Sequence, residues 1–127
     1  MLLCLLVYAL LAARTAHADS PGKKDYLADC ARCHGADGKG DVPEMRAVPG
    51  YVAVDLTQLS KEHNGQFPRE EVYQAIDGRR RLPAHFVGDM PTWGLKYQGS
   101  SVSPQAEERV RRRISALVDY IESIQAR

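Results

Sequence analysis

Two cysteines and a histidine form the densest chemical signal in the chain, in the segment Cys30-Ala31-Arg32-Cys33-His34. The C-x-x-C-H spacing is the attachment signature of c-type haem. Cysteines three positions apart share one helical turn, so each thiol can add to one vinyl group of the same porphyrin. The next residue then directs its imidazole at the iron from that face. The pattern predicts one haem c, covalently bound through Cys30 and Cys33, with His34 as an iron ligand.

Other uses of a cysteine pair are weaker alternatives. A redox-active dithiol belongs to a strand-helix setting that the sequence does not indicate. A structural zinc site needs four ligands, and His63 and His85 are 22 positions apart rather than three to five. A disulfide between Cys30 and Cys33 is the plainest alternative. The glycine-rich segment 35–40 lacks the ending of a phosphate-binding loop, and we interpret it as a turn beneath a porphyrin edge.

The second axial ligand decides the function, because His/Met ligation raises the reduction potential and suits electron transfer. Met90 is the candidate, since it lies 56 residues after His34 and Pro91 stiffens the backbone beside it. Met45 follows His34 by only 11 residues, which makes the opposite face of the porphyrin difficult to reach. His85 is the alternative ligand. The ordinary alternative for Met90 itself is core filling.

The first residues have the pattern of an export signal. Residues 2–13 form an apolar run that is too short for a comfortable membrane span. Residues 16–18 read Ala-His-Ala, the small-x-small pattern that a signal peptidase accepts. We therefore expect a signal peptide over residues 1–18 and one domain over residues 19–127, located in the periplasm without a membrane span.

The composition fits one globular domain. The chain has 127 residues, of which 44% are hydrophobic and 26% charged. Its net charge is +1, and without Arg14 of the signal, 16 of the 17 basic residues remain against 16 acidic ones. This balance argues against a nucleic-acid-binding protein.

Two short helices are expected before Met90. The first covers residues 25–33 and places Tyr26, Leu27 and Cys30 on one side. The second covers residues 68–76, begins at a proline and stops at a glycine. Between them we expect loops, with a turn of helix around residues 56–60.

The last helix has the clearest pattern. Ser103 is a good N-cap, and the proline that follows it fits the first turn. Apolar residues then recur at intervals of three and four positions, which predicts one buried face: Val110, Ile114, Leu117, Val118, Ile121 and Ile124. Glu107 with Arg111, and Glu108 with Arg112, are expected to pair along the exposed face. The predicted fold class is all-α.

These motifs together resemble class I cytochromes c, and more closely the small bacterial periplasmic monohaem cytochromes. The resemblance covers nearly all of residues 19–127. Besides C-x-x-C-H, it rests on Phe67-Pro68-x-x-x-Val72-Tyr73-x-x-Ile76-Asp77-Gly78-Arg79, then His85, then Met90-Pro91-x-Trp93-Gly94. It implies a cytochrome c fold of three to five short helices and long loops wrapped around one haem, in which the N- and C-terminal helices cross.

The resemblance also implies roles for residues around the haem. Tyr26 and Tyr120 would be aromatic partners at the helix crossing. The carbonyl of Pro43 would accept the Nδ1–H of the proximal histidine. Trp93, and an arginine within residues 79–81, are candidates to contact the haem propionates, with packing and a solvated face as their ordinary alternatives.

The leading functional hypothesis is one-electron transfer, with a membrane oxidoreductase complex or a periplasmic dehydrogenase as redox partner. The chain itself would not be an enzyme. Residues 79–81, which are three arginines, would form a docking patch near the haem edge. The alternatives are a haem subunit of a larger oxidoreductase, or an open-site haem enzyme or gas sensor. The core is thin for so many loops, so the haem is expected to stabilise the fold.

Overall fold

The computed structural model describes residues 20–51, 53–79 and 90–126. These contain six α-helices and no strand, so the all-α prediction is confirmed. The helices are α2 (Pro21–Asp29), α3 (Ala31–His34), α4 (Leu59–Glu62), α5 (Arg69–Asp77), α6 (Trp93–Gln98) and α7 (Pro104–Ser123). Two 3-10 turns, η1 (Pro43–Met45) and η2 (Leu56–Gln58), lie in the loops. The single-turn helices α3 and α4 bring the number above the three to five expected.

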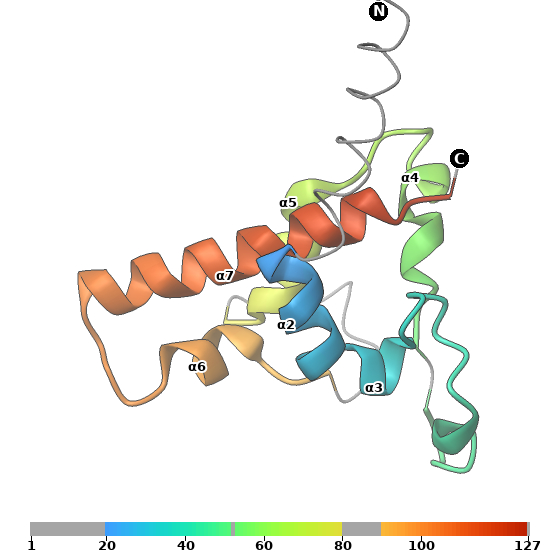
Figure 1. Cartoon of the computed structure of the whole chain (residues 1–127), viewed down its shortest axis with the longest axis horizontal. Coiled ribbons are helices and arrows are strands. Elements are labelled where there is room, and N and C mark those ends of the chain that lie inside the picture. Colours follow the sequence, from blue (N-terminus) through green and yellow to red (C-terminus); the bar gives the residue numbers. More distant parts are fainter. Residues whose placement is uncertain (1–19, 52, 80–89, 127) are drawn as a thin grey trace, which may run out of the picture.

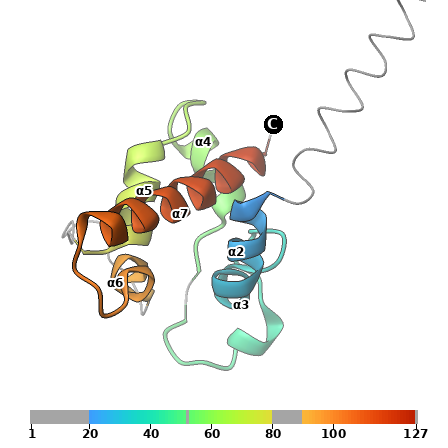
Figure 2. The same cartoon turned by 60° about the vertical axis from the view of Figure 1, so that its left-hand side comes forward.

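The long helix α7 organises the fold. Helices α2, α5 and α6 all pack against it. Figure 1 shows α6 beside the N-terminal half of α7 and α2 crossing it farther along, and Figure 2 shows α5 on another side of α7. The expected crossing of the N- and C-terminal helices is therefore present.

Helix α7 begins and packs as its sequence predicts. The Oγ of Ser103 accepts a hydrogen bond from the backbone N–H of Ala106 at 3.1 Å, and Pro104 occupies the first turn. The predicted apolar face is buried except for Ile124, which caps the helix and is half-buried. The rings of Tyr26 and Tyr120 meet where α2 and α7 cross, with centroids 5.1 Å apart. The predicted aromatic pair is thus confirmed.

One predicted ion pair on α7 is replaced. Arg111 donates to Glu108, and Arg112 also lies 3.5 Å from Glu108. The carboxylate of Glu107 accepts two hydrogen bonds from Arg79, in place of the predicted ion pair with Arg111. A tertiary partner with two donors in a fixed fork competes well with a neighbour along the helix.

The predicted helix over residues 25–33 is two helices. Ser20 caps α2 by accepting a hydrogen bond from the N–H of Lys23 at 3.2 Å, so α2 begins earlier than expected. Cys30 separates α2 from α3, and α3 continues through His34. Tyr26 and Cys30 are buried, whereas Leu27 is 46% exposed and does not share their side.

Helix α5 and the turn at η2 and α4 match expectation, but α6 was not predicted. Gly78 ends α5 in the left-handed conformation at φ 64°. Helix α6 has six residues, which is too short for a repeating apolar pattern, and it includes Gly94, a poor helix former. A Cβ on Gly94 would lie 1.9 Å from Oδ1 of Asp77, so close packing requires glycine there.

Candidate functional site

The C-x-x-C-H residues lie on one turn of backbone. The N–H groups of Cys33 and His34 donate to the carbonyl of Cys30 at 3.0 and 2.9 Å. Cys30 is 7% exposed and Cys33 half-buried, and no disulfide joins them. Two thiols and an imidazole therefore project from one turn, which is the donor set that covalent attachment of one porphyrin requires.

The pKa of the Cys30 thiol bears on whether the cysteine pair is a redox-active dithiol. Burial raises the pKa of the Cys30 thiol to about 12, with Asp29 and Asp25 adding to the effect. Reactive dithiol centres depend on a cysteine whose pKa is lowered, so that the thiolate forms near neutral pH. The raised pKa argues against a reactive dithiol at Cys30.

His34 is oriented by a backbone carbonyl. Its Nδ1 lies 3.3 Å from the carbonyl oxygen of Val54, and a protonated Nδ1 donates a hydrogen bond there. Burial lowers the pKa of His34, with the Val54 bond opposing the effect. A neutral ring with its proton on Nδ1 leaves the Nε2 lone pair for a metal ion.

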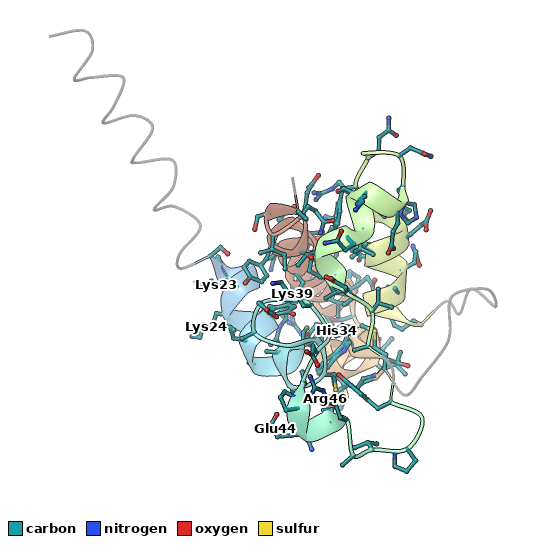
Figure 3. All side chains as sticks on the ribbon, turned by 90° about the vertical axis from the view of Figure 1, so that its right-hand side faces the viewer. Lys23, Lys24, His34, Lys39, Glu44 and Arg46 are labelled. Carbon is teal, nitrogen blue, oxygen red and sulfur yellow. The ribbon has the colours of Figure 1, made fainter. Side chains whose placement is uncertain are left out.

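The prediction that the Pro43 carbonyl accepts the Nδ1–H of His34 is wrong. The Pro43 carbonyl accepts the backbone N–H of Arg46 at 3.2 Å within η1. Val54 comes 20 positions after His34, and no local pattern marks a carbonyl as an acceptor. Figure 3 views this side of the molecule, where His34 lies among the side chains of the loop segments.

The glycine-rich loop brings Val54 to His34. The N–H of Gly40 donates to the carbonyl of His34 at 2.8 Å, and the N–H of Leu56 donates to the carbonyl of Gly38 at 2.7 Å. Gly40 has φ 74°, and a Cβ on it would lie 2.6 Å from the carbonyl oxygen of Ala53. The close approach that Gly40 permits is to the backbone of Ala53, and the predicted approach of this turn to a porphyrin edge stays a prediction.

The end of α7 holds the segment that carries Val54. Nε2 of Gln125 donates to the carbonyl of Leu56 at 2.6 Å, and its Oε1 accepts the N–H of Ser60 at 2.9 Å. The N–H of Ala126 donates to the carbonyl of Thr57 at 2.8 Å. The sequence gives no sign of this role for Gln125, because the two segments are 65 or more positions apart.

Two tyrosines, neither predicted as a loop-binding group, fix the turn after the cysteines. The hydroxyl of Tyr26 donates to the carbonyl of Gly35 at 2.7 Å, and that of Tyr51 donates to the carbonyl of Cys33. Burial raises the pKa of both phenols. They stay protonated as donors at neutral pH.

A second unpredicted cluster supports the helix before Cys30. The hydroxyl of Tyr97 in α6 donates to Asp29 at 2.9 Å. Arg113 of α7 donates to Asp25 at 2.9 and 3.0 Å and to Asp29 at 3.2 Å, and its guanidinium lies 4.0 Å from the ring centroid of Tyr97. The cluster joins α2, α6 and α7 directly beside the cysteines.

Met90, the predicted second ligand, is half-buried and packs against the hydrophobic core that contains Cys30 and Trp93. The alternative ligand His85 lies outside the described residues. Met45 lies in η1, and His63 is used locally, with Nδ1 2.8 Å from the carbonyl of Leu59.

The residues proposed for propionates have other neighbours. Trp93 is buried, its ring lies 5.6 Å from that of Tyr97, and the Nζ of Lys96 lies 4.2 Å from its centroid. The guanidinium of Arg79 forms ion pairs with Asp77 and Glu107. Arg79 is therefore neither part of a solvated face nor free to dock a partner, which are two roles that the sequence suggested for it. Positions 80 and 81 lie outside the described residues.

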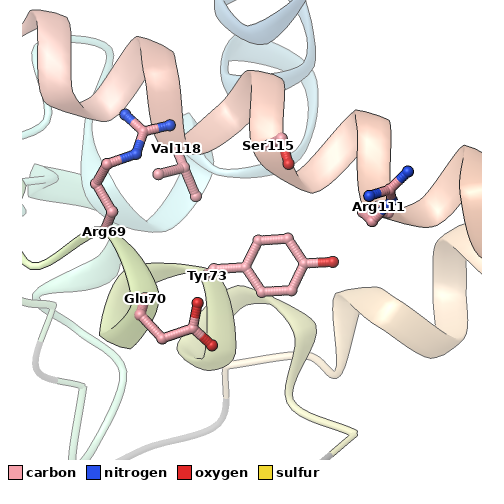
Figure 4. Close-up of a pocket in the computed structure, with 6 residues that line it drawn as sticks. All are labelled: Arg69, Glu70, Tyr73, Arg111, Ser115 and Val118. Atoms are coloured by element: carbon pink, nitrogen blue, oxygen red, sulfur yellow. The ribbon is translucent and has the colours of Figure 1, made fainter.

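A groove of about 400 Å³ lies between α5 and α7, lined by Arg69, Glu70, Tyr73, Arg111, Ser115 and Val118 (Figure 4). None of these residues belongs to α3 or to the loop after it. Among the described residues, no three His, Cys, Asp or Glu side chains cluster as a metal site would require. The groove is therefore not part of the C-x-x-C-H site.

The family model for cytochrome c matches residues 20–125, and the chain belongs to the cytochrome c family. The comparisons with curated proteins and with solved structures give no match. Family membership establishes haem-based electron transfer, covalent haem c and redox protein partners in general terms. No helix in the described part of the chain is long and apolar enough to cross a membrane.

Proposed function

We propose that this protein is a one-electron carrier of the periplasm, with one haem c whose axial ligands are His34 and Met90. The observation that carries the proposal is the turn that holds Cys30, Cys33 and His34, with the Nδ1 of His34 directed at the carbonyl of Val54. A haem held by these residues would supply a one-electron couple for exchange between a reduced and an oxidised partner.

The protein's residues would set the properties of that couple. Cys30 and Cys33 hold the group in place through thioether bonds. The hydrogen bond from Nδ1 of His34 to Val54 keeps the ring in one orientation and makes Nε2 more basic. The thioether of Met90 raises the reduction potential relative to a second histidine. With both axial positions of the iron occupied by protein ligands, no coordination position would remain for a substrate. This supports a carrier over an enzyme.

The partner is proposed to be a membrane oxidoreductase complex or a periplasmic dehydrogenase. Near-zero net charge after signal removal gives little long-range steering, so the surface close to the haem would govern docking. Transient electron-transfer complexes bury small areas, which allows fast release.

Export and haem number can be tested together. We propose that residues 1–18 are removed, so that the protein begins at Asp19. Expression with a c-haem maturation system, isolation from the periplasm and intact-mass measurement should give the mass of residues 19–127 plus one haem. A retained residue 1–18 segment, or a different number of haems, would contradict this part of the proposal.

Axial ligation is tested by the visible spectrum of the holoprotein and of two methionine variants. The wild type should be low-spin when reduced, insensitive to carbon monoxide, and show the weak far-red sulfur-to-iron band when oxidised. Met90→Ala should lose that band and bind carbon monoxide. Met45→Ala, a control that removes a half-buried methionine from η1, should keep the wild-type spectrum.

Each contrary result has a definite meaning. A high-spin or carbon-monoxide-sensitive wild type would indicate an open-site enzyme or sensor. A low-spin wild type without the sulfur band would indicate a nitrogen ligand such as His85. Absence of covalent haem would overturn the whole proposal.

A further inference from the structure

One guanidinium joins three helices on the side of the fold that leads to Met90. Arg79 follows α5 and donates to the Asp77 carboxylate through Nε at 2.5 Å and Nη2 at 3.0 Å. It donates to Glu107, in the first turn of α7, through Nη1 at 2.7 Å and Nη2 at 2.8 Å. Its Nη1 also lies 3.4 Å from Oε1 of Gln98, at the end of α6.

This cluster is shielded from water at its centre. The side chains of Arg79 and Asp77 are only 19% and 11% exposed, while Glu107 is 56% exposed. Removing paired charges from water is costly, and the cost is recovered only with good geometry and well-satisfied donors. Arg79 meets that condition through two bidentate contacts, which also fix the relative positions of the groups they join.

The chain just after Met90 is pressed against this cluster. A Cβ on Gly94 would lie 1.9 Å from Oδ1 of Asp77 and 2.6 Å from Nε of Arg79. A Cβ on Gly78 would lie 3.3 Å from Cα of Thr92. Segments 77–79 and 92–94 are therefore in direct contact, and Met90 precedes that contact by only two residues.

We propose that Arg79, together with Asp77 and Glu107, is a positioning group that holds Met90 in place as the axial ligand. The inference rests on the proposed His34/Met90 ligation. A competing ligand binds only when the methionine has left the iron, so its apparent affinity follows the fraction of ligand-free states. Loosening the segment 92–94 increases that fraction, even while the fold and the haem are retained.

The test is a titration of the ferric holoprotein with imidazole, which displaces a methionine and abolishes the sulfur-to-iron band. Arg79→Gln should bind imidazole about tenfold more tightly than the wild type, and Glu107→Gln about threefold more tightly. The matched control is Arg69→Gln, because Arg69 also bridges α5 to α7, through Asp119 and Glu122. It should change imidazole affinity less than about twofold, even though it also removes an ion pair.

A conservative variant separates positioning from general destabilisation. Arg79→Lys retains the charge but not the planar fork, so it should give an imidazole affinity between those of wild type and Arg79→Gln. Urea unfolding of each variant provides the stability change for comparison. Equal imidazole affinity in Arg79→Gln and Arg69→Gln would overturn the inference while leaving Met90 as ligand.

Two further outcomes are decisive. If the wild-type protein lacks the sulfur-to-iron band, the proposed ligation fails and the positioning role fails with it. If Arg79→Gln does not fold, Glu107→Gln and its control Glu122→Gln decide the matter. Tighter imidazole binding by Glu107→Gln alone supports the inference, and equal binding by the two variants refutes it.

Discussion

Gly22 of α2 lies directly against the backbone of Ala116 in α7. A Cβ at Gly22 would come within 1.9 Å of the Ala116 carbonyl oxygen and 3.1 Å of the Cβ of Tyr120. Glycine is a poor helix former, yet at this position it lets the two helices approach closely. Tyr26 of α2 is buried, and Cys30 caps the end of the same helix, so the crossing lies one helix away from the attachment cysteines.

Gly22→Ala should therefore destabilise the protein, although the same change in an exposed helix stabilises it. The added methyl group forces the helices apart, at a cost of about 1–3 kcal/mol, against a gain of roughly 0.5–1 kcal/mol from helix propensity. Urea unfolding of the holoprotein measures the difference. An unfolding free energy at or above that of the wild type would show that the crossing does not depend on this contact.

The buried phenol of Tyr26 should make stability fall at high pH. Burial raises its pKa above the ordinary value of 10. A raised folded-state pKa means that the contribution to stability is fully present below about pH 10 and is lost as the pH rises toward the folded value. Unfolding free energies measured from pH 8 to pH 11 should decline, and the decline should be smaller in Tyr26→Phe.

That variant also has a cost at neutral pH. Loss of the hydrogen bond from Tyr26 to the Gly35 carbonyl should lower the unfolding free energy by about 1 kcal/mol. The ring contact with Tyr120 is retained. A pH dependence identical to that of the wild type would assign the high-pH decline to other groups, such as Tyr97, whose pKa is also raised by burial and by its bond to Asp29.

The parts of this fold that could be predicted are those determined by residues close together in the sequence. Caps at Ser103 and Gly78, and the apolar face of α7, act within a few residues, so position and type suffice. The C-x-x-C-H turn is equally local. Helix α6 could not be predicted, because Gly94 is selected by contact with Asp77 rather than by helix propensity.

The cysteines and the histidine of the site could be predicted from the sequence, but the groups that hold the ligands in place could not. Val54 acts through its carbonyl, which every residue has, so its side chain carries no signal. Arg79 lies in a run of three arginines that resembles an exposed cation patch, and only the fold brings Asp77 and Glu107 around it. Charged residues that pair with partners far away in the sequence show no characteristic spacing from which the pairing could be predicted.

Gly40 offers a test of the contact between the glycine-rich loop and the proximal histidine. Gly40→Ala places a methyl group 2.6 Å from the Ala53 carbonyl, so the segment that carries Val54 must shift away from His34. We expect a stability loss of roughly 2–4 kcal/mol from strain and overpacking. We also expect a measurable change in reduction potential, because the His34 hydrogen bond is weakened.

Gly65→Ala is the matched control. Gly65 also has a positive φ, 84°, but a Cβ there meets nothing within 4 Å. It should lose about 1–2 kcal/mol from backbone strain alone and keep the wild-type potential. Equal potentials in the two variants would mean that the loop does not transmit its position to His34.

Haem attachment should be required for a stable fold. Twelve apolar side chains are buried among the described residues, and seven of them belong to the single helix α7. Long loops with so small a core leave the entropy of chain ordering poorly compensated. A group bound only by the folded state shifts the equilibrium toward folding.

The Cys30→Ala, Cys33→Ala double variant tests this requirement, since it removes both attachment points while keeping two small residues on the α3 turn. We expect reduced helical signal in far-ultraviolet circular dichroism and a broad thermal transition. Met90→Ala with the whole C-x-x-C-H segment retained is the comparison, because it keeps the attachment residues but loses the proposed second ligand, and it should remain more helical. A cooperative transition in the double variant, at the temperature of the holoprotein, would show that the polypeptide core suffices without haem.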